Sequence, residues 1–168
     1  MRYSFNKITR EAAIVISKWE YPPPYNFYNM DPSEEGLADL LNGDYYSATD
    51  EAGNIAGFFC HGLSARVSGG YRAGFYEDRE RLDIGLAMKP SLTGQGLGRT
   101  FVQEGMSYLQ QQLGRTRFRL VVATFNERAK RVYEENGFTP IGTVLSAVNG
   151  EDVEFLCMVA DRDNRDNR

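Results

Sequence analysis

Apolar residues recur at two spacings along this chain, and each spacing indicates one kind of element. Short alternating or continuous apolar runs predict strands at 3–8, 45–49, 55–60, 82–88, 119–123, 141–148 and 153–159. Apolar residues three and four positions apart predict helices at 10–19, between Val102 and Leu113, and at 127–136. A capping pattern indicates one more short helix after Asp31. The predicted order is therefore β-α-α-β-β-β-α-β-α-β-β.

Short local signals set the ends of several elements. Three prolines, Pro22 to Pro24, end the first helix because each fixes φ and lacks a backbone donor. Asp31 is expected to cap the second helix, with Pro32 at its first position and Gly43 closing it. Asn149-Gly150, between two apolar runs, predicts a two-residue hairpin turn.

This order predicts the α/β class with a mixed central sheet and helices on its faces. A doubly wound parallel sheet is excluded, because strands and helices alternate only in the middle of the chain. The hairpins before and after that part add antiparallel strands. We expect one domain over residues 1–160 and a loose polar tail over 161–168.

Composition narrows the classes of function. A net charge of −4 gives no sign of the excess positive charge that nucleic-acid-binding proteins carry. No window approaches the roughly 18 apolar residues of a membrane span, and the N-terminus lacks a secretory signal, so we expect a cytoplasmic protein. The only histidine is His61, and Cys60 and Cys157 lack metal-ligand spacing. Reduced core thiols and no metal site are therefore expected.

The most informative local motif is the turn Thr93-Gly94-Gln95-Gly96-Leu97-Gly98, which joins a strand directly to a helix. Alternate glycines let the backbone come close to a ligand. Unpaired amides at the start of the next helix attract phosphate, and Lys89 and Arg99 could add charge. Neither G-x-G-x-x-G nor the P-loop pattern G-x-x-x-x-G-K-[ST] fits this spacing. A plain tight turn remains an alternative.

Two motifs in register resemble the GNAT superfamily of N-acetyltransferases. The turn fits the family pattern [QR]-x-x-G-x-[GA] at both small-residue positions, with Thr93 in place of glutamine or arginine. Downstream, Asn126, Ala129, Tyr133 and Gly137-Phe138 fit the family pattern N-x-x-A-x-x-x-Y-x-x-x-G-F, which follows a strand. The order of elements outside these motifs also fits the family.

The resemblance implies a mixed sheet that splays at a cofactor cleft, with acetyl-CoA as cosubstrate and no metal. Gly85 is compatible with a β-bulge that would splay the sheet. The pantetheine would bond to the strand before the turn and the pyrophosphate to the amides of the turn. Asn126 could bond the pantetheine or only cap its helix. The implied cofactor-binding residues are Leu86, Ala87, Met88, Thr93, Gly94, Gln95, Gly96, Leu97, Gly98, Arg99, Asn126 and Ala129.

The resemblance also implies catalytic roles. Tyr133 would protonate the leaving thiolate, or else it is a buried core tyrosine. Asp83 and Glu80 could relay the proton from the amine, or else they are solvated surface acids; His61 is a further candidate base. Aromatic residues of the N-terminal segment could bind the acceptor or simply cover the domain, and the candidate substrate contacts are Trp19, Tyr25 and Tyr28.

Together these features predict an acyltransferase that moves the acetyl group of acetyl-CoA directly to an amine of a small molecule or peptide. A non-catalytic acyl-CoA sensor or interaction module on the same fold is the alternative. Tyr133 and the acids near the cleft favour the enzyme. No nucleic-acid or membrane partner is expected, and a homodimer remains open.

Overall fold

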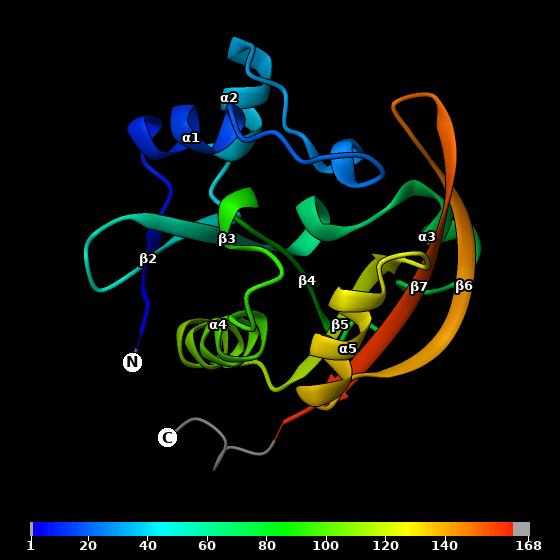
Figure 1. Ribbon diagram of the computed structural model, residues 1–168. Coiled ribbons are helices and arrows are strands. Elements are labelled where there is room, and N and C mark those ends of the chain that lie inside the picture. Colours follow the sequence, from blue (N-terminus) through cyan, green and yellow to red (C-terminus); the bar gives the residue numbers. More distant parts are fainter. Residues whose placement is uncertain (1, 163–168) are drawn as a thin grey trace.

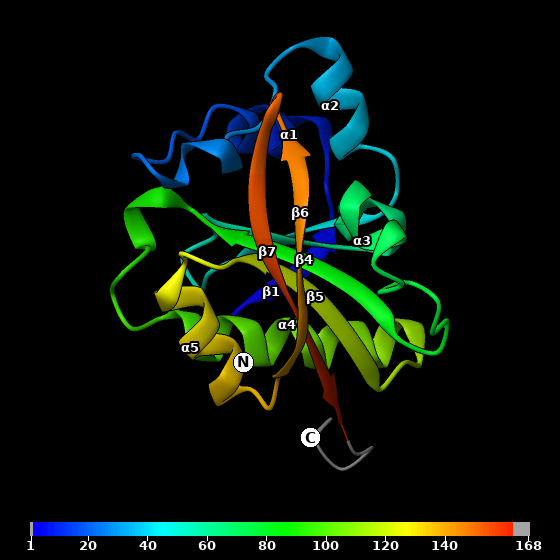
Figure 2. The same ribbon diagram turned by 90° about the vertical axis from the view of Figure 1, so that its right-hand side faces the viewer.

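The computed structural model describes residues 2–162, which form a seven-stranded sheet with helices on both faces (Figures 1 and 2). The strands are β1 (Ser4–Lys7), β2 (Tyr45–Thr49), β3 (Ile55–His61), β4 (Leu82–Met88), β5 (Arg117–Ala123), β6 (Thr139–Val148) and β7 (Glu151–Asp161). The α-helices are α1 (Arg10–Ser17), α2 (Glu34–Leu40), α3 (Ser68–Arg72), α4 (Gly98–Leu113) and α5 (Glu127–Glu135). Short 3₁₀ helices are η1 (Tyr25–Tyr28), η2 (Gly62–Ala65) and η3 (Pro90–Leu92).

The sheet opens in its middle. Its strand order is β1-β2-β3-β4-β5-β7-β6, and every neighbouring pair is antiparallel except β4 and β5, which run parallel. That parallel pair joins only Leu82 to Phe118 and Asp83 to Arg119, and the two strands then separate. The sheet therefore forms a V that is closed at Asp83 and Arg119. The predicted mixed, splayed sheet is confirmed.

The β-bulge considered at Gly85 does not occur between β3 and β4. The register between β3 and β4 is continuous, from His61 opposite Ile84 to Gly57 opposite Met88. The sheet splays because β5 leaves β4, whereas β3 stays paired with β4 from Ile84 to Met88.

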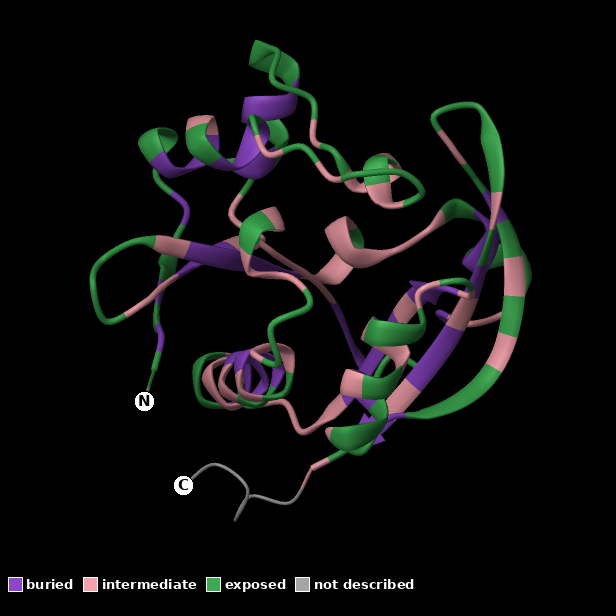
Figure 3. Cartoon of the chain, viewed as in Figure 1, coloured by how far each residue is buried: buried purple, intermediate pink, exposed green. Residues whose placement is uncertain are grey.

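Helices cover the two faces of the sheet unequally. Helices α4 and α5 lie on one face, and α1 and α2 lie on the other (Figures 1 and 2). Helix α4 packs closely on β3 because Gly105 has no side chain: a Cβ there would lie 2.0 Å from the ring of Phe59. Figure 3 shows the buried residues along the central strands and the inner side of α4, where Phe101, Met106 and Leu109 enter the main core.

The start of α2 differs from the prediction. Its N-cap is Ser33, whose hydroxyl accepts the amide of Gly36 at 3.3 Å. Asp31 accepts the amide and the hydroxyl of Ser33 at 2.9 and 2.7 Å, so its carboxylate is used in the turn before the helix. The expectation that Asp31 caps the helix and that Pro32 starts it is therefore wrong.

Other boundaries are close to those expected. Asn149 and Gly150 both have positive φ, 52° and 82°, which confirms the tight β6–β7 turn. Helix α3 was not predicted from the apolar pattern. Strand β7 continues through Asp161, one residue into the expected tail, and residues 163–168 of that tail lie outside the described part of the chain.

Candidate active site

A groove of about 700 Å³ occupies the open side of the V between β4 and β5. Its floor is the second half of β4, from Gly85 to Met88. One end is formed by the glycine turn and the first turns of α4 and α5. The other end is formed by residues 64–67, at the end of η2 and just after it. Tyrosines of the segment around η1 form a further wall.

The glycine turn presents a row of free backbone donors. Gly94 and Gly96 have φ values of +74° and +75°, which glycine adopts readily and other residues avoid. Among residues 2–162, none of the backbone amides from Gly94 to Thr100 donates a hydrogen bond, and the first amide of α4 that does so belongs to Phe101. Exposed amides beside the positive end of a 16-residue helix form a strong site for phosphate.

Two polar side chains of the turn stabilise its shape. The hydroxyl of Thr93 donates to the carbonyl of Pro90 at 2.8 Å, and Nε2 of Gln95 donates to the carbonyl of Ser91 at 2.6 Å. Thr93 also lines the groove, whereas the side chain of Gln95 is directed back to η3. Thr93, where this chain departs from the family pattern, therefore stabilises the turn through its hydroxyl.

Three arginines line the groove near this turn, and only Arg99 was singled out from the sequence. Arg128 and Arg131 extend from α5, and a Cβ added to Gly94 would lie 2.8 Å from Nη1 of Arg128. The guanidinium of Arg128 also stacks over the ring of Tyr25, 5.1 Å from its centroid. The signal for this pair was their spacing of one helical turn, next to the motif residue Asn126.

The residues Leu86, Ala87 and Met88 form the floor beyond the point where β5 leaves. The edge of β4 that faces β5 has no partner strand there, so its backbone groups are available to an extended ligand. One of the carbonyls is already used, because the hydroxyl of Tyr21 donates to Met88 at 2.6 Å. This contact ties the N-terminal aromatic segment to the groove.

Asn126 joins two walls of the groove. Its Oδ1 accepts the amide of Ala129 at 3.2 Å, which caps α5, and its Nδ2 donates to the hydroxyl of Tyr28 at 3.3 Å. The capping role considered from the sequence is present. Ala129 lines the groove with only a methyl group. Burial raises the pKa of Tyr28, so its phenol stays protonated at neutral pH.

Tyr133 is the buried residue of α5, and it lines the groove. Its ring packs edge-to-face on Phe138, with centroids 5.9 Å apart. Among residues 2–162 its hydroxyl has no hydrogen-bond partner. The hydroxyl oxygen is not sealed from solvent, so a ligand in the groove can reach it. Burial raises the pKa of this phenol, so it remains a proton donor at neutral pH.

The structure does not bring Asp83 and Glu80 into the groove lining. Asp83 is 3% exposed and is held by two guanidinium groups, those of Arg119 and Arg66. Glu80 is exposed and pairs with Arg117, at 2.5 Å. Neither carboxylate is free to accept a proton from a group in the groove.

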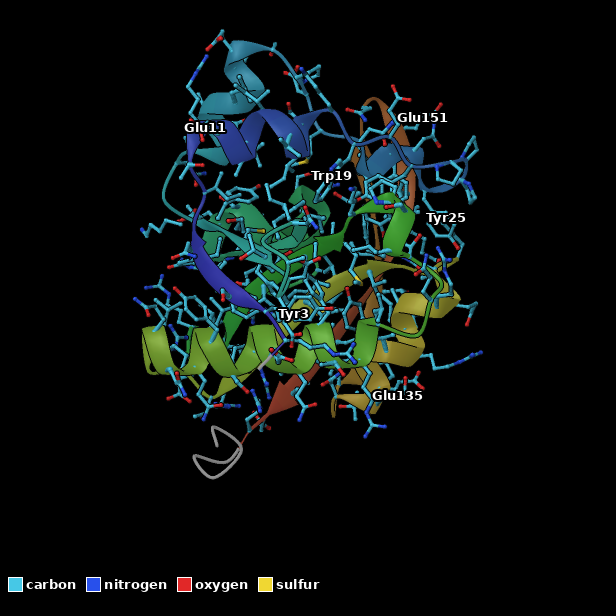
Figure 4. All side chains as sticks on the ribbon, turned by 60° about the vertical axis from the view of Figure 1, so that its left-hand side comes forward. Tyr3, Glu11, Trp19, Tyr25, Glu135 and Glu151 are labelled. Atoms are coloured by element: carbon cyan, nitrogen blue, oxygen red, sulfur yellow. The ribbon has the colours of Figure 1, made fainter. Side chains whose placement is uncertain are left out.

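The aromatic residues of the N-terminal segment have different places. Tyr25 and Tyr28 line the groove, but Trp19 packs on the second core between α1, α2 and β3. Figure 4 shows Trp19 near the middle of the molecule and Tyr25 toward the outer side, where α5 lies. Tyr21, which the sequence interpretation left out of the substrate contacts, also lines the groove.

Cys60 lines the groove next to Gly85, and burial raises the pKa of its thiol to about 12. His61 stacks on Tyr46 and is not part of the groove lining. Within residues 2–162, no three histidine, cysteine or acidic side chains are grouped so that they could hold a metal ion. No helix in this range is long and apolar enough to cross a membrane.

The profile of the acetyltransferase (GNAT) family matches residues 12–138, which is most of the chain and includes the whole groove floor, the glycine turn and α5. The chain belongs to this family. The resemblance inferred from the two motifs is confirmed, and the protein is an acyltransferase of the GNAT class. A comparison with curated proteins found no match.

Solved structures of GNAT enzymes share the fold. A chimera of the spermidine N-acetyltransferase SpeG from Vibrio cholerae and hSSAT has a TM-score of 0.74 at 19% identity, with 100% of both chains covered. AAC(6')-Ib in complex with paromomycin and acetyl-CoA has a TM-score of 0.74 at 19% identity, covering 96% of this chain and 94% of the other. The Vibrio cholerae spermidine N-acetyltransferase with CoA and spermine has a TM-score of 0.70 at 18% identity, with 95% of each chain covered.

Proposed function

We propose that this GNAT enzyme transfers the acetyl group of acetyl-CoA directly to an amine of a small molecule or peptide. The observation that carries the proposal is the row of unbonded amides from Gly94 to Thr100, at the end of a groove floored by an unpaired strand edge. Similar solved structures that hold acetyl-CoA or CoA support it.

The residues of the groove fit this cosubstrate. The amides of the turn, together with Arg99, Arg128 and Arg131, would hold the pyrophosphate. The free edge of β4 would bond the pantetheine as an added strand through Leu86, and Ala87, whose backbone carbonyl faces β3, would contact it from the groove floor. Ala129 leaves room for that arm, and the second hydrogen on Nδ2 of Asn126 is available to it.

Acetyl-CoA, when bound, supplies an activated thioester. The chain's own part is to position it and to move protons. The unbonded hydroxyl of Tyr133, protonated at neutral pH, would donate its proton to the departing sulfur. Cys60 stays a protonated thiol at neutral pH because of its raised pKa, which argues for direct transfer without an acyl-cysteine.

The proton of the substrate ammonium needs another route. Among residues 2–162, the one carboxylate in the groove lining belongs to Glu135, at the end of α5. Because Asp83 is clamped by Arg119 and Arg66, we assign it a positioning role and expect the ammonium to lose its proton to water in the groove. Glu80, on the exposed side of the sheet, takes no part.

Two measurements test the proposal. Acetyl-CoA at about 100 times its Kd should stabilise the folded protein by roughly 2.7 kcal/mol and raise its Tm, whereas NADH and ATP should leave the Tm unchanged. Incubation with acetyl-CoA and a broad panel of amines should release free CoA thiol. Binding without thiol release on any amine, or no shift of the Tm with any CoA ester, would overturn the proposal.

A further inference from the structure

The closed end of the V holds more positive than negative charge. Two guanidinium groups share the single carboxylate of Asp83: Nε of Arg66 contacts Oδ2 at 2.8 Å, and Arg119 contacts both oxygens. One positive charge is therefore left without a countercharge in this cluster. A partly buried positive charge is stabilised by an anion that comes close to it.

Only Arg66 can present that charge to a ligand. Arg119 is 1% exposed, and its three nitrogens are used by Asp83 and by the carbonyl of Asp78. Arg66 is partly exposed and lines the groove. Its guanidinium lies over the ring of Tyr76, 4.6 Å from the centroid, which holds it in place. Among residues 2–162 it contacts no carboxylate other than Asp83.

Arg66 lies at the end of the groove opposite the phosphate-binding turn. Along β4, the five residue steps from Met88 to Asp83 span roughly 17 Å. The CoA proposed above would occupy the turn and the middle of this strand. The part left for the acceptor is bounded by Gly85, Cys60 and residues 64–67.

Within the described part of the chain, no carboxylate lines this acceptor end of the groove. Glu135 lines the groove at its other end, one residue from Asn136, whose amide donates to the carbonyl of Arg99. Asp44 accepts the hydroxyl of Ser64 from outside the groove lining. Glu77 lines a separate cavity, which Arg66 also borders, and is not part of the groove lining.

We propose that the acceptor is a small amine that also carries a carboxylate, in the manner of an amino acid, and that Arg66 binds this carboxylate. The inference rests on the proposed acetyl transfer and specifies its substrate. An arginine fork fits a carboxylate with two parallel hydrogen bonds. The same positive charge disfavours a second ammonium group nearby, so a polyamine or a polycationic aminoglycoside is a poor acceptor.

The first experiment uses the wild-type enzyme and follows thiol release from acetyl-CoA. The acceptors are the twenty protein amino acids, the amines obtained from them by decarboxylation, spermidine and paromomycin. The best amino acid should have a kcat/KM at least about tenfold above that of its decarboxylated counterpart and above both polycations. A preference for a decarboxylated amine or a polycation overturns this inference while leaving acetyl transfer intact. Thiol release from none of these acceptors overturns this inference, while the broader amine panel described above decides whether acetyl transfer itself stands.

The second experiment compares Arg66→Met with Arg79→Met. Arg66→Met leaves the pair of Asp83 and Arg119 in place, and Arg79 lines the separate cavity but not the groove. In Arg66→Met the KM for the best amino acid should rise about tenfold or more, while the KM for acetyl-CoA stays within a few-fold. Arg79→Met should change neither KM. An unchanged amino-acid KM in folded Arg66→Met overturns the assignment; if this variant does not fold, the wild-type preference decides.

Discussion

Arg119 donates hydrogen bonds to both carboxylate oxygens of Asp83, from Nε to Oδ1 at 2.6 Å and from Nη2 to Oδ2 at 2.9 Å. The two residues are also the last paired residues of β4 and β5 before these strands separate. Their ion pair therefore fastens the closed end of the V. The carboxylate that the sequence suggested as a proton relay is held in this contact, for which we propose a positioning role.

Replacing Asp83 with asparagine should destabilise the protein strongly. The change leaves the guanidinium of Arg119 buried without its countercharge, and breaking a buried pair typically costs about 3–5 kcal/mol. In a chain of this size the Tm should fall by roughly 10 °C. Thermal denaturation at neutral pH measures the change.

Glu80→Gln is the matched control. It also removes a carboxylate from an arginine of β5, Arg117, but this pair is exposed, so the Tm should stay within experimental error. Turnover should also be unchanged. If Asp83→Asn kept the wild-type Tm and lost only turnover, Asp83 would have to be reinstated as the base.

The predictable parts of the site are those in which a short segment fixes its own geometry. The glycine turn has its free amides, and Asn126 caps α5, because both depend on residues close in sequence. The role of Asp83 could not be read in this way, because its partner Arg119 is 36 residues away. The second partner, Arg66, follows a 3₁₀ turn in a region with no apolar period.

The same limit explains Trp19. Its place in a cluster of aromatic residues suggested contact with a ligand, but α1 ends two residues earlier and the indole remains with the second core. Tyr21 is carried on to β4, where its hydroxyl bonds Met88. Which aromatic residue reaches the groove depends on how the segment crosses the sheet, and local composition does not determine that path.

Replacing Gly96 with alanine should weaken the binding of acetyl-CoA by about tenfold or more. A Cβ would project where the backbone has to approach phosphate, and a positive φ costs a non-glycine residue about 1–2 kcal/mol. Calorimetric titration of the variant gives the affinity, and thermal denaturation gives the loss of stability.

Gly114→Ala separates these two effects. Gly114 ends α4 with φ +65°, and a Cβ there, as at Gly96, meets no atom within 4 Å. Both variants should lose similar stability, but only Gly96→Ala should lose affinity. Equal affinity in the two variants would show that the turn is a structural feature and does not bind the cosubstrate.

The stability of the wild-type protein should fall as the pH rises above 9. Burial raises the pKa of the Cys60 thiol from 9.0 to about 12, so the folded state keeps a proton that the unfolded chain releases. The contribution of Cys60 to stability is fully present below pH 9 and is lost progressively toward pH 12. By pH 11 the stability lost in this way amounts to roughly 2–3 kcal/mol. Urea denaturation at pH 7.5 and pH 11 measures this loss.

Cys60→Ala supplies the comparison. Ionisation of the buried tyrosines lowers the stability of both proteins in the same pH range, so the difference between them reports on Cys60. The variant should begin less stable at pH 7.5, since it leaves a small void, and should then lose less between pH 7.5 and pH 11. Parallel losses in the two proteins would mean that the thiol is not sealed from water, and Cys60 would become a candidate nucleophile.

Tyr133→Phe should lower turnover by about 10²-fold while leaving the fold and the cosubstrate affinity nearly unchanged. The hydroxyl makes no hydrogen bond to residues 2–162, so its removal breaks no contact there, and the ring still packs on Phe138. The required measurements are the Tm, the Kd for acetyl-CoA and kcat with one accepted amine.

The dependence of the wild-type rate on pH is a second test. Because the pKa of Tyr133 is raised, its phenol keeps its proton near neutral pH, and its deprotonation should not lower the rate there. Tyr46→Phe is the matched control: Tyr46 is equally buried in the main core but does not line the groove, so its loss should leave kcat unchanged. A core role for Tyr133 would give the reverse pattern, with a lower Tm and normal turnover. Full activity in Tyr133→Phe would remove this phenol from the mechanism and leave water as the proton donor to the departing sulfur.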